Sequence, residues 1–538
     1  MELNVGRLVE AVADAVPDRE AIVWRGRGRW TYAELRDRCR RLAAVLAGAG
    51  LGVHPRDGEL DPWAAGQDLA LLFMTNCPEY LEGMLGCYLG RVGPANVNYR
   101  YTADEVAYLV ADSGARAALV HARFAPLLLD ACRLAGRSLE RVLVVDDGSG
   151  TPPPDGTVDY EDALATADVS LPTDEPAPDD LYIVYTGGTT GMPKGVLWRQ
   201  TDFLAGALGV TGTYAGLAAA AASLDPARLR ALPAPPLMHG AAHWNALSCL
   251  ASGGTVVLPA HPEHVEPADL LDTIEQERCT SLNVVGDAFA RPLADAFEAE
   301  PRDLSSLRHL ISGGAILSPA TKARWTDLVP GLRVVDIMGS SESGRQGVAH
   351  GGGPSRFRPP PSAVVLSADR SRTLAPGDEE IGWLATTGPI PRGYLGDAAK
   401  TAATFPVIGG VRYVVAGDRA RLDAHGSVEL LGRESVTINS GGEKVFAEEV
   451  EAAVKSHPAV VDAIVVGRPS ERWGQEVVAL VALRAEATVT DEELRESAGA
   501  HLARYKLPKA FLRVDAVGRT ASGKPDYAWA TRQVGSSS

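Results

Sequence analysis

The stretch LYIVYTGGTTGMPKG, residues 181–195, is the most informative part of the sequence. An apolar segment of strand character runs directly into a loop with four glycines, three threonines and one lysine. Glycines let several backbone N–H groups converge on one anion, threonine hydroxyls add donors, and lysine adds positive charge. The stretch therefore predicts a strand that ends in a phosphate-binding loop.

Two other phosphate loops do not fit this stretch. A Walker A loop has glycine directly before its lysine and serine or threonine directly after it, whereas Lys194 lies between Pro193 and Gly195. The glycine spacing also differs from the GxGxxG turn of dinucleotide-binding domains. An ordinary glycine-rich turn is the alternative, but the density of hydroxyl donors favours a phosphate site.

Strand and helix patterns alternate on both sides of the loop. Thr31 and Glu34 form the pattern of a capping box ahead of an amphipathic helix, and apolar runs such as residues 69–73 have the length of buried strands. Strands that alternate with helices indicate βαβ units and a parallel sheet. Residues 362–431 have a shorter pattern of strands and glycine turns, and residues 433–538 have the length of a small independent domain.

The composition narrows the class of protein. With 538 residues, 46% of them hydrophobic and 22% charged, the chain is typical of folded globular proteins. A formal net charge of −16 argues against general binding of nucleic acid or anionic membranes. Six cysteines without a CxxC pair indicate reduced thiols rather than a disulfide framework or structural zinc. With no signal-peptide pattern and no long apolar run, we expect no membrane span and a cytoplasmic location.

Residues 185–195 resemble the signature loop of the adenylate-forming enzymes. This superfamily comprises acyl- and aryl-CoA synthetases, nonribosomal adenylation domains and luciferases. The flanking segments NVNYRY (residues 96–101) and VLWRQ (residues 196–200) are similar to bacterial fatty-acyl-CoA ligases. Further motifs that resemble those of the family follow in the expected order along nearly the whole chain.

The resemblance implies an α/β fold with a large N-terminal domain and a small C-terminal domain. The large domain, residues 1–432, would bind ATP and the acyl group in two stacked α/β subdomains and a small β-barrel-like subdomain. The α+β domain of residues 433–538 would be mobile and would carry the adenylation lysine. It would rotate about residues 434–436 between two half-reactions.

The resemblance also implies site residues. The catalytic ones would be Lys524, Glu342, Thr186 and His239, with Glu342 holding Mg²⁺ through a carboxylate oxygen. Asp418 would accept hydrogen bonds from the ribose, and Arg433 would contact the ribose and phosphates. The full set of predicted contacts with ATP and CoA is Thr186, Gly187, Gly188, Thr189, Thr190, Gly191, Lys194, Gly313, Gly314, Ala315, Gly339, Ser340, Ser341, Asp418, Arg433, Gly441, Gly442 and Lys444.

Two other kinds of site were considered from the residues alone. His239 and His243 have the i, i+4 spacing of a helical metal site, but no third ligand is evident, and His243 is expected to be a core histidine. The segment from Gly339 to Ser343 does not match a GxSxG nucleophile elbow, because Ser343 occupies the last glycine position. No Ser/His or Cys/His nucleophile pattern is apparent.

The predicted activity is that of an ATP-dependent acyl- or aryl-CoA synthetase. A small-molecule carboxylic acid would attack ATP, pyrophosphate would leave, and CoA would then take the acyl group with release of AMP. One alternative keeps the scaffold but activates nitrite and transfers it to an aryl amine, as a diazotase. Another is a nucleotide-binding protein without turnover. Because dimers are common in the superfamily, a homodimer is also expected.

Overall fold

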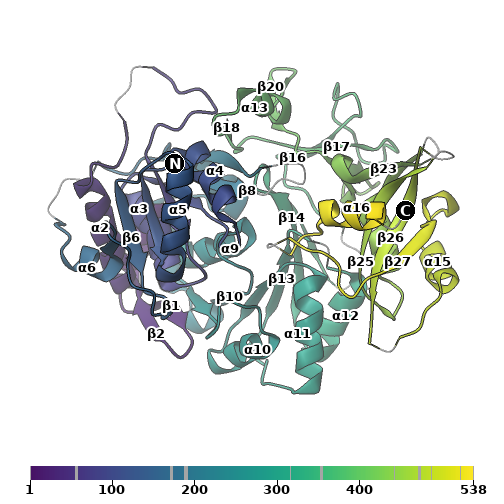
Figure 1. Ribbon diagram of the computed structural model, residues 1–538, viewed down its shortest axis with the longest axis horizontal. Helices are drawn as coiled ribbons and strands as arrows, with labels where there is room; N and C mark the ends of the chain where they lie inside the picture. The colour runs from purple at the N-terminus through teal and green to yellow at the C-terminus, as the bar shows by residue number, and fades with distance from the viewer. Residues whose placement is uncertain are drawn as a thin grey trace.

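The computed structural model describes residues 2–54, 58–169, 174–186, 192–315, 317–351, 356–440, 443–470, 474–485, 487–520 and 523–536. The chain forms several sheets arranged along one long axis (Figure 1). The N-terminal α/β region lies at one end of this axis and the C-terminal segment at the other. The strands between them form the sheet that carries most of the predicted site.

A five-stranded parallel sheet has the order β4-β3-β5-β6-β7. Its strands are β3 (Leu69–Phe73), β4 (Gly93–Asn96), β5 (Ala117–His121), β6 (Arg141–Val145) and β7 (Val158–Asp159). The accompanying helices are α1 (Val5–Ala15), α2 (Tyr32–Gly48), α3 (Pro78–Leu89), α4 (Ala103–Ser113), α5 (Ala125–Leu134) and α6 (Tyr160–Ala165). The predicted capping box of Thr31 and Glu34 is present at the start of α2.

The eight-stranded sheet has the order β15-β14-β13-β12-β10-β11-β1-β2. Its strands are β1 (Glu20–Trp24), β2 (Gly28–Thr31), β10 (Arg230–Pro233), β11 (Thr255–Leu258), β12 (Ser281–Val284), β13 (His309–Gly313), β14 (Arg333–Ser340) and β15 (Gly344–His350). The N-terminal hairpin β1–β2 therefore does not join the sheet formed by β3 to β7, which follow it in sequence. Its strand β1 pairs with β11 in the eight-stranded sheet instead. The helices of this region are α9 (Gly240–Ala251), α10 (Pro267–Gln276), α11 (Asp287–Ala299) and α12 (Pro319–Leu328).

Between these sheets, β8 (Leu181–Thr186) and β9 (Lys194–Arg199) form an antiparallel pair that β18 (Gly393–Tyr394) extends. Thr186 and Lys194 form the last pair of the β8–β9 ladder, and the glycine-rich loop connects these two residues. The chain continues through α7 (Gln200–Phe203), the π-helical turn η2 (Leu204–Leu208) and α8 (Tyr214–Ser223). The phosphate loop thus begins at the end of a buried strand, as the sequence predicts.

A smaller antiparallel sheet follows, and its strands are β16 (Ala363–Leu366), β17 (Gly382–Thr387), β19 (Val407–Ile408), β20 (Val411–Val414), β21 (Asp418–Leu422) and β22 (Val428–Arg433), with helix α13 (Ala398–Thr404). A short 3₁₀ turn, η4 (Glu434–Val436), leads from β22 into the C-terminal region. The predicted pivot coincides with this turn. The domain boundary at residue 432 stays a prediction.

The C-terminal sheet has the order β24-β23-β26-β25, with β27 beside β26. Its elements are β23 (Thr437–Ser440), β24 (Glu443–Phe446), α14 (Ala447–Val454), β25 (Val460–Ser470), β26 (Gly474–Leu483), α15 (Asp491–Gly499), η5 (Arg504–Lys506), β27 (Ala510–Arg513) and α16 (Tyr527–Ser536). Helix α16 lies on the side that faces the large sheet (Figure 1).

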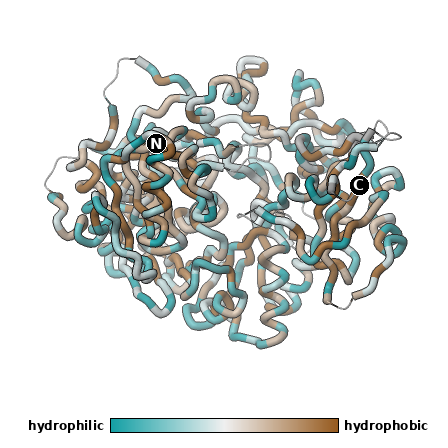
Figure 2. The backbone as a smooth tube through the Cα atoms, in the orientation of Figure 1, coloured by the Kyte–Doolittle hydropathy of each residue, from teal (hydrophilic) through white to brown (hydrophobic). Residues whose placement is uncertain are grey.

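Apolar residues are concentrated in the strands and in the helix faces that cover them (Figure 2). All six cysteines are buried and free. Within the described residues, no helix combines the length and the apolar character needed to span a bilayer. The architecture confirms the α/β fold with a large N-terminal and a small C-terminal domain.

Candidate active site

One cavity of about 550 Å³ brings many of the predicted site residues together. It lies at the carboxyl ends of β8, β12, β13 and β14 and is closed on one side by the C-terminal loop. Carboxyl ends of parallel strands are where α/β sheets bind ligands. The predicted residues that line it are Thr186, His239, Gly313, Gly314, Gly339, Ser340, Ser341 and Lys524.

Asn96, to which the sequence analysis gave no role, fixes two walls of this cavity. Its side-chain amide donates to the backbone oxygen of Tyr185 at 2.9 Å and to that of Met238 at 2.8 Å. Its Oδ1 atom accepts from the backbone N–H of Tyr185 at 2.7 Å. Asn96 therefore joins the strand before the phosphate loop to the residue before His239. Its position at the end of β4 is the sequence signal that could have identified it.

Glu342 lies in the tight turn between β14 and β15. The backbone N–H groups of Ser340 and Ser343 each donate to the other residue's hydroxyl, at 3.1 and 3.2 Å. Gly344 closes the turn with φ of +67°, and an added Cβ there would lie 2.7 Å from a backbone oxygen. The hydroxyl of Tyr394 donates to Oε1 of Glu342 at 3.2 Å. The turn therefore presents one carboxylate in a fixed direction.

Asp418 and Arg433 are opposite each other in the β21–β22 ladder. The guanidinium Nε of Arg433 donates to Oδ1 of Asp418 at 3.1 Å. The charge of Asp418 raises the pKa of Arg433, and Glu342 acts in the same direction. The two predicted nucleotide contacts therefore form one charged pair.

Lys524 is held at the cavity by a short loop of the C-terminal region. The guanidinium of Arg519 donates to the backbone oxygen of Gly523 at 2.7 Å and forms an ion pair with Asp462 on β25 at 2.6 Å. A Cβ built on Gly314 would lie 3.8 Å from Cε of Lys524. The lysine stem thus passes over the end of β13, and Arg519 is a positioning residue that the sequence analysis missed.

The charges around Lys524 are mixed. Desolvation by the surrounding protein and then the positive charge of Arg433 lower the pKa of Lys524, while Glu342 and Asp418 oppose this effect. The side chain is accessible from the cavity that it lines. These couplings show that Arg433, Glu342 and Asp418 lie near Lys524, although none of the three lines the cavity itself.

Some predicted contacts lie elsewhere. Lys194 forms an ion pair with Asp397 at 3.1 Å and does not line the cavity. Ala315 packs against the core beside α11 rather than lining the cavity. Gly187, Gly188, Thr189, Thr190, Gly191, Gly441 and Gly442 lie outside the described residues, as does the side chain of Lys444.

One face of α9 forms a long wall of the cavity. Gly240, Ala241, Trp244, Asn245 and Ser248 line it, a spacing that keeps them on the same side of a helix. His239, at the N-terminal end of α9, lines the same cavity. The polar side chains Asn245 and Ser248 lie one to two turns further along.

His243 is a core residue, as predicted. Its Nδ1 atom lies 2.8 Å from the backbone oxygen of Leu237, and its Nε2 atom lies 2.6 Å from the hydroxyl of Tyr182. The indole N–H of Trp244 donates to the same hydroxyl at 2.6 Å. Burial lowers the pKa of His243 to about 4. A neutral His243 ring with the proton on Nδ1 can donate to Leu237 and accept from Tyr182. All hydrogen bonds of this group are then satisfied, and Trp244 is held in place by its bond to Tyr182.

No group of three or more His, Cys, Asp or Glu side chains in the described part of the chain could hold a metal ion. Because Tyr182 and Leu237 occupy both nitrogens of His243, this histidine has no nitrogen left to bind a metal together with His239. Glu342 would be a sufficient protein ligand for Mg²⁺ that arrives with a nucleotide. Mg²⁺ is usually bound by one or two carboxylates, and waters and phosphate oxygens supply its other ligands.

The sequence matches the family described as "AMP-binding enzyme" over residues 9–394 and the "AMP-binding enzyme C-terminal domain" over residues 449–524. The chain belongs to the AMP-binding enzyme family. It is 48% identical to "Medium-chain acyl-CoA ligase Mig" of Mycobacterium avium, over 99% of this chain and 98% of that protein. It is 40% identical to the "3-oxocholest-4-en-26-oate--CoA ligase" of Rhodococcus rhodochrous, over 99% and 96%.

Several solved structures have the same fold. The anthranilate CoA ligase AuaEII, in complex with anthranoyl-AMP, has a TM-score of 0.82 at 21% identity. The match covers 99% of this chain and 98% of AuaEII. ATP-bound MatB from Rhodopseudomonas palustris has a TM-score of 0.79 at 24% identity, with 99% of each chain covered. These structures confirm the fold. The sequence relatives show an AMP-forming acid–thiol ligase, for which ATP, CoA and a small-molecule acid are fitting substrates.

Proposed function

We propose that this AMP-forming acyl-CoA synthetase acts on medium-chain carboxylic acids. The observation that carries the proposal is the length of the α9 wall. Gly240 and Ser248 both line the cavity, and eight residues at ~1.5 Å per residue span ~12 Å. With C–C bonds of ~1.5 Å, an extended hydrocarbon advances ~1.3 Å per carbon. A wall of ~12 Å thus matches roughly nine carbons, in agreement with the name of the Mycobacterium avium relative.

In the first half-reaction, two anions have to meet. The acid's carboxylate would lie beside His239, and the α-phosphate of ATP would lie between Thr186 and Lys524. Asp418 would accept hydrogen bonds from the ribose hydroxyls, and Arg433 would balance the negative charge of Asp418. Lys524 would stabilise the charge that spreads over the phosphate in the transition state.

Mg²⁺, bound with ATP at Glu342, would neutralise phosphate charge. The hydrogen bond from Tyr394 and the tight turn keep the Glu342 carboxylate oriented before ATP arrives. The protein's own contribution is therefore a carboxylate held in place for a metal that the substrate brings.

In the second half-reaction the thiol of CoA would attack the acyl carbonyl and AMP would leave. No protein nucleophile is required. Lys524 reaches the cavity in the present arrangement, which suits adenylation. The resemblance implies that a rotation of the C-terminal region about η4 would then present the loop of residues 440–442 for thiol transfer. The cytoplasmic location and the homodimer stay predictions.

A panel of straight-chain acids from four to eighteen carbons, with ATP, Mg²⁺ and CoA, tests the proposal. Release of AMP and formation of acyl-CoA should be greatest near eight to ten carbons. A parallel reaction with nitrite and an aryl amine tests the diazotase alternative, and absence of AMP release from every acid would favour the nucleotide-binding alternative. A maximum at sixteen or more carbons would contradict the medium-chain assignment.

A further inference from the structure

A second hollow, of about 730 Å³, lies at the opposite end of the eight-stranded sheet. We call it the arginine hollow, because Arg228, Arg278, Arg308 and Arg333 line it together with His309. His309 and Arg333 are the first residues of β13 and β14 and are paired in register. At ~3.3 Å per residue, β13 and β14 separate the hollow from the catalytic cavity by roughly 13 to 23 Å.

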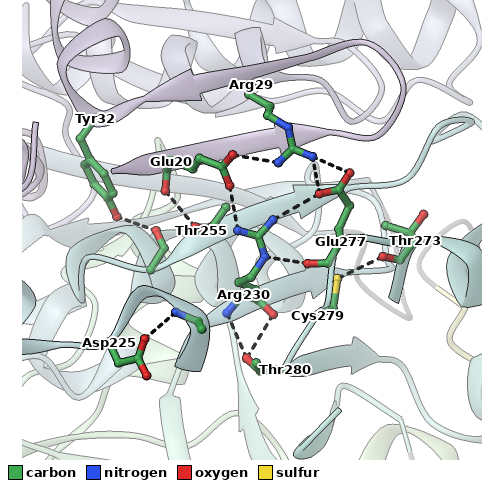
Figure 3. A network of polar contacts seen from close by, with 12 residues as sticks. Glu20, Arg29, Tyr32, Asp225, Arg230, Thr255, Thr273, Glu277, Cys279 and Thr280 are labelled. Carbon is green, nitrogen blue, oxygen red and sulfur yellow. Dashed lines mark hydrogen bonds and ion pairs between the residues drawn. The ribbon is translucent and has the colours of Figure 1, made fainter. Parts of the chain in front are cut away.

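A network of ion-paired arginines lies next to the hollow, because Thr280, which lines the hollow, accepts from the backbone N–H of Arg230. Arg230, on the adjacent β10, forms ion pairs with Glu20 at 2.8 Å and with Glu277 at 3.3 Å, and Arg29 contacts the same two carboxylates (Figure 3). Figure 3 also shows Thr280 hydrogen-bonded to the backbone of Arg230. This compact network balances each positive charge with a negative one.

Inside the hollow the charges are not balanced. Arg278 pairs with Asp303 at 2.7 Å and Arg228 lies 3.6 Å from Asp225, and all four of these side chains are exposed. The exposed side chains of Arg308 and Arg333 have no carboxylate within 4 Å among the residues that the structure describes. Burial and the charge of Arg333 lower the pKa of His309. An acidic protein thus gathers uncompensated positive charge in one concavity.

The chemistry of these side chains defines the ligand. Guanidinium groups donate paired hydrogen bonds that match phosphate oxygens. Two uncompensated arginines, with two more at the rim, require a ligand with at least two negative charges. We propose that the arginine hollow binds a small, soluble ligand that carries a diphosphate or polyphosphate group. This site is separate from the ATP site.

Two other partners fit less well. A membrane surface would meet exposed apolar side chains beside the basic patch, but the large exposed apolar residues within the described ranges lie in other segments, such as Leu134, Val265 and Val407. A carrier protein would have to present its thiol to the catalytic cavity, which opens at the other end of the strands. A concave site with clustered arginines suits a compact polyanion.

Inorganic tripolyphosphate is the probe, and binding is measured by isothermal titration calorimetry on the full chain. The catalytic cavity contributes one class of sites in all variants. The wild type should show a second class, which a double variant with Arg308→Ser and Arg333→Ser should lose or weaken at least tenfold. Removing two exposed arginines of equal charge elsewhere, with Arg133→Ser and Arg137→Ser, should leave both classes unchanged.

A double variant with Arg308→Lys and Arg333→Lys keeps the charge but loses the paired donors, so binding should weaken but stay detectable. Melting temperatures equal to that of the wild type establish that the variants are folded. Identical isotherms for the wild type and the Arg308→Ser, Arg333→Ser variant would overturn the proposal. So would arginine-dependent binding to phosphatidylserine vesicles without any second class of tripolyphosphate sites, which would assign the hollow to a membrane.

Discussion

Asp418 and Arg433 face each other across the β21–β22 ladder, and Nε of Arg433 lies 3.1 Å from Oδ1 of Asp418. Arg433 therefore holds the Asp418 carboxylate in one orientation and leaves its second oxygen for a ligand. The hydrogen-bonding partner of that oxygen would be the ribose.

Replacing Asp418 with alanine should weaken ATP binding and leave the preference among acids unchanged. Hydrogen bonds to a charged group contribute about 1.5–3 kcal/mol, so the Kd for ATP should rise roughly 10- to 100-fold. Glu429→Ala is the matched control, because Glu429 pairs with Arg421 at 2.6 Å further along the same ladder. Altered acid preference with unchanged ATP affinity would remove Asp418 from the nucleotide site.

Replacing Lys524 with alanine should separate the two half-reactions. Acid-dependent exchange of pyrophosphate should fall roughly 10²–10³-fold, the scale of a lost electrostatic stabiliser. Conversion of a supplied acyl-adenylate to acyl-CoA should be nearly unaffected. Lys509→Ala, at an exposed lysine of the same region, should change neither rate. Normal exchange in Lys524→Ala would refute the assignment.

Replacing Arg519 with alanine tests whether this residue positions Lys524. The loop would lose its bond to the Gly523 oxygen and its ion pair with Asp462. The rate of adenylation should fall, by less than in Lys524→Ala, while the Kd for ATP stays within about twofold of the wild type. Arg519→Lys should recover part of the rate. Arg513→Ala, which breaks an exposed pair with Asp491, is the control. A purely structural role would instead lower both half-reactions together.

His243 should make the stability of the protein depend on pH. Its pKa is about 4 in the folded protein and about 6.5 in the unfolded chain, so between these values the unfolded state binds more protons. The free energy of unfolding therefore decreases as pH falls from 6.5 to 4, by about 3 kcal/mol for this group. Urea unfolding of His243→Gln across this range should give a smaller decrease than the wild type.

His121, whose pKa burial also lowers to about 4, should keep its own share of the pH dependence in that variant. His425→Gln, at an exposed site, should behave as the wild type. Equal pH dependence in His243→Gln and the wild type would show that His243 is not the neutral core residue that its contacts imply.

Replacing Ser248 with phenylalanine should shorten the acyl cavity. Ser248 lines its wall, two turns of α9 beyond Gly240, so a large ring there would occupy the space of several carbons. The preferred acid should become shorter by about three or four carbons, at ~1.3 Å per carbon. Ser252→Phe, at the exposed end of α9, should leave the chain-length profile unchanged. An unchanged profile in Ser248→Phe would place the acyl group elsewhere.

The sequence predicted those features that depend on local order. The capping box at Thr31, the strand before the phosphate loop and the core position of His243 all follow from short-range patterns. The contributions of Tyr394 and Arg519 could not be predicted, because their partners lie 52 and 57 residues away in the chain. The register of β21 and β22, which makes Asp418 and Arg433 partners, is likewise a tertiary property.

The environment of Met338 also depends on tertiary structure that the sequence does not predict. Met338 is 5% exposed and packs with Val365 and Leu384 in the small sheet's core. Its neighbours Ile337 and Gly339 line the cavity instead. Because side chains alternate along a strand, the register of β14 decides which residue meets the nucleotide.

The pairing of β1 with β11 also determines when the protein can fold on the ribosome. Ile22 is in register with Val256, so the N-terminal hairpin waits for a partner about 230 residues later in synthesis. At ~5–20 residues per second this delay is roughly 10 to 50 seconds. During that time the apolar strand of residues 20–24 has no sheet to join. The nascent chain therefore exposes one of its earliest buried strands for most of the time needed to translate the first half of the protein.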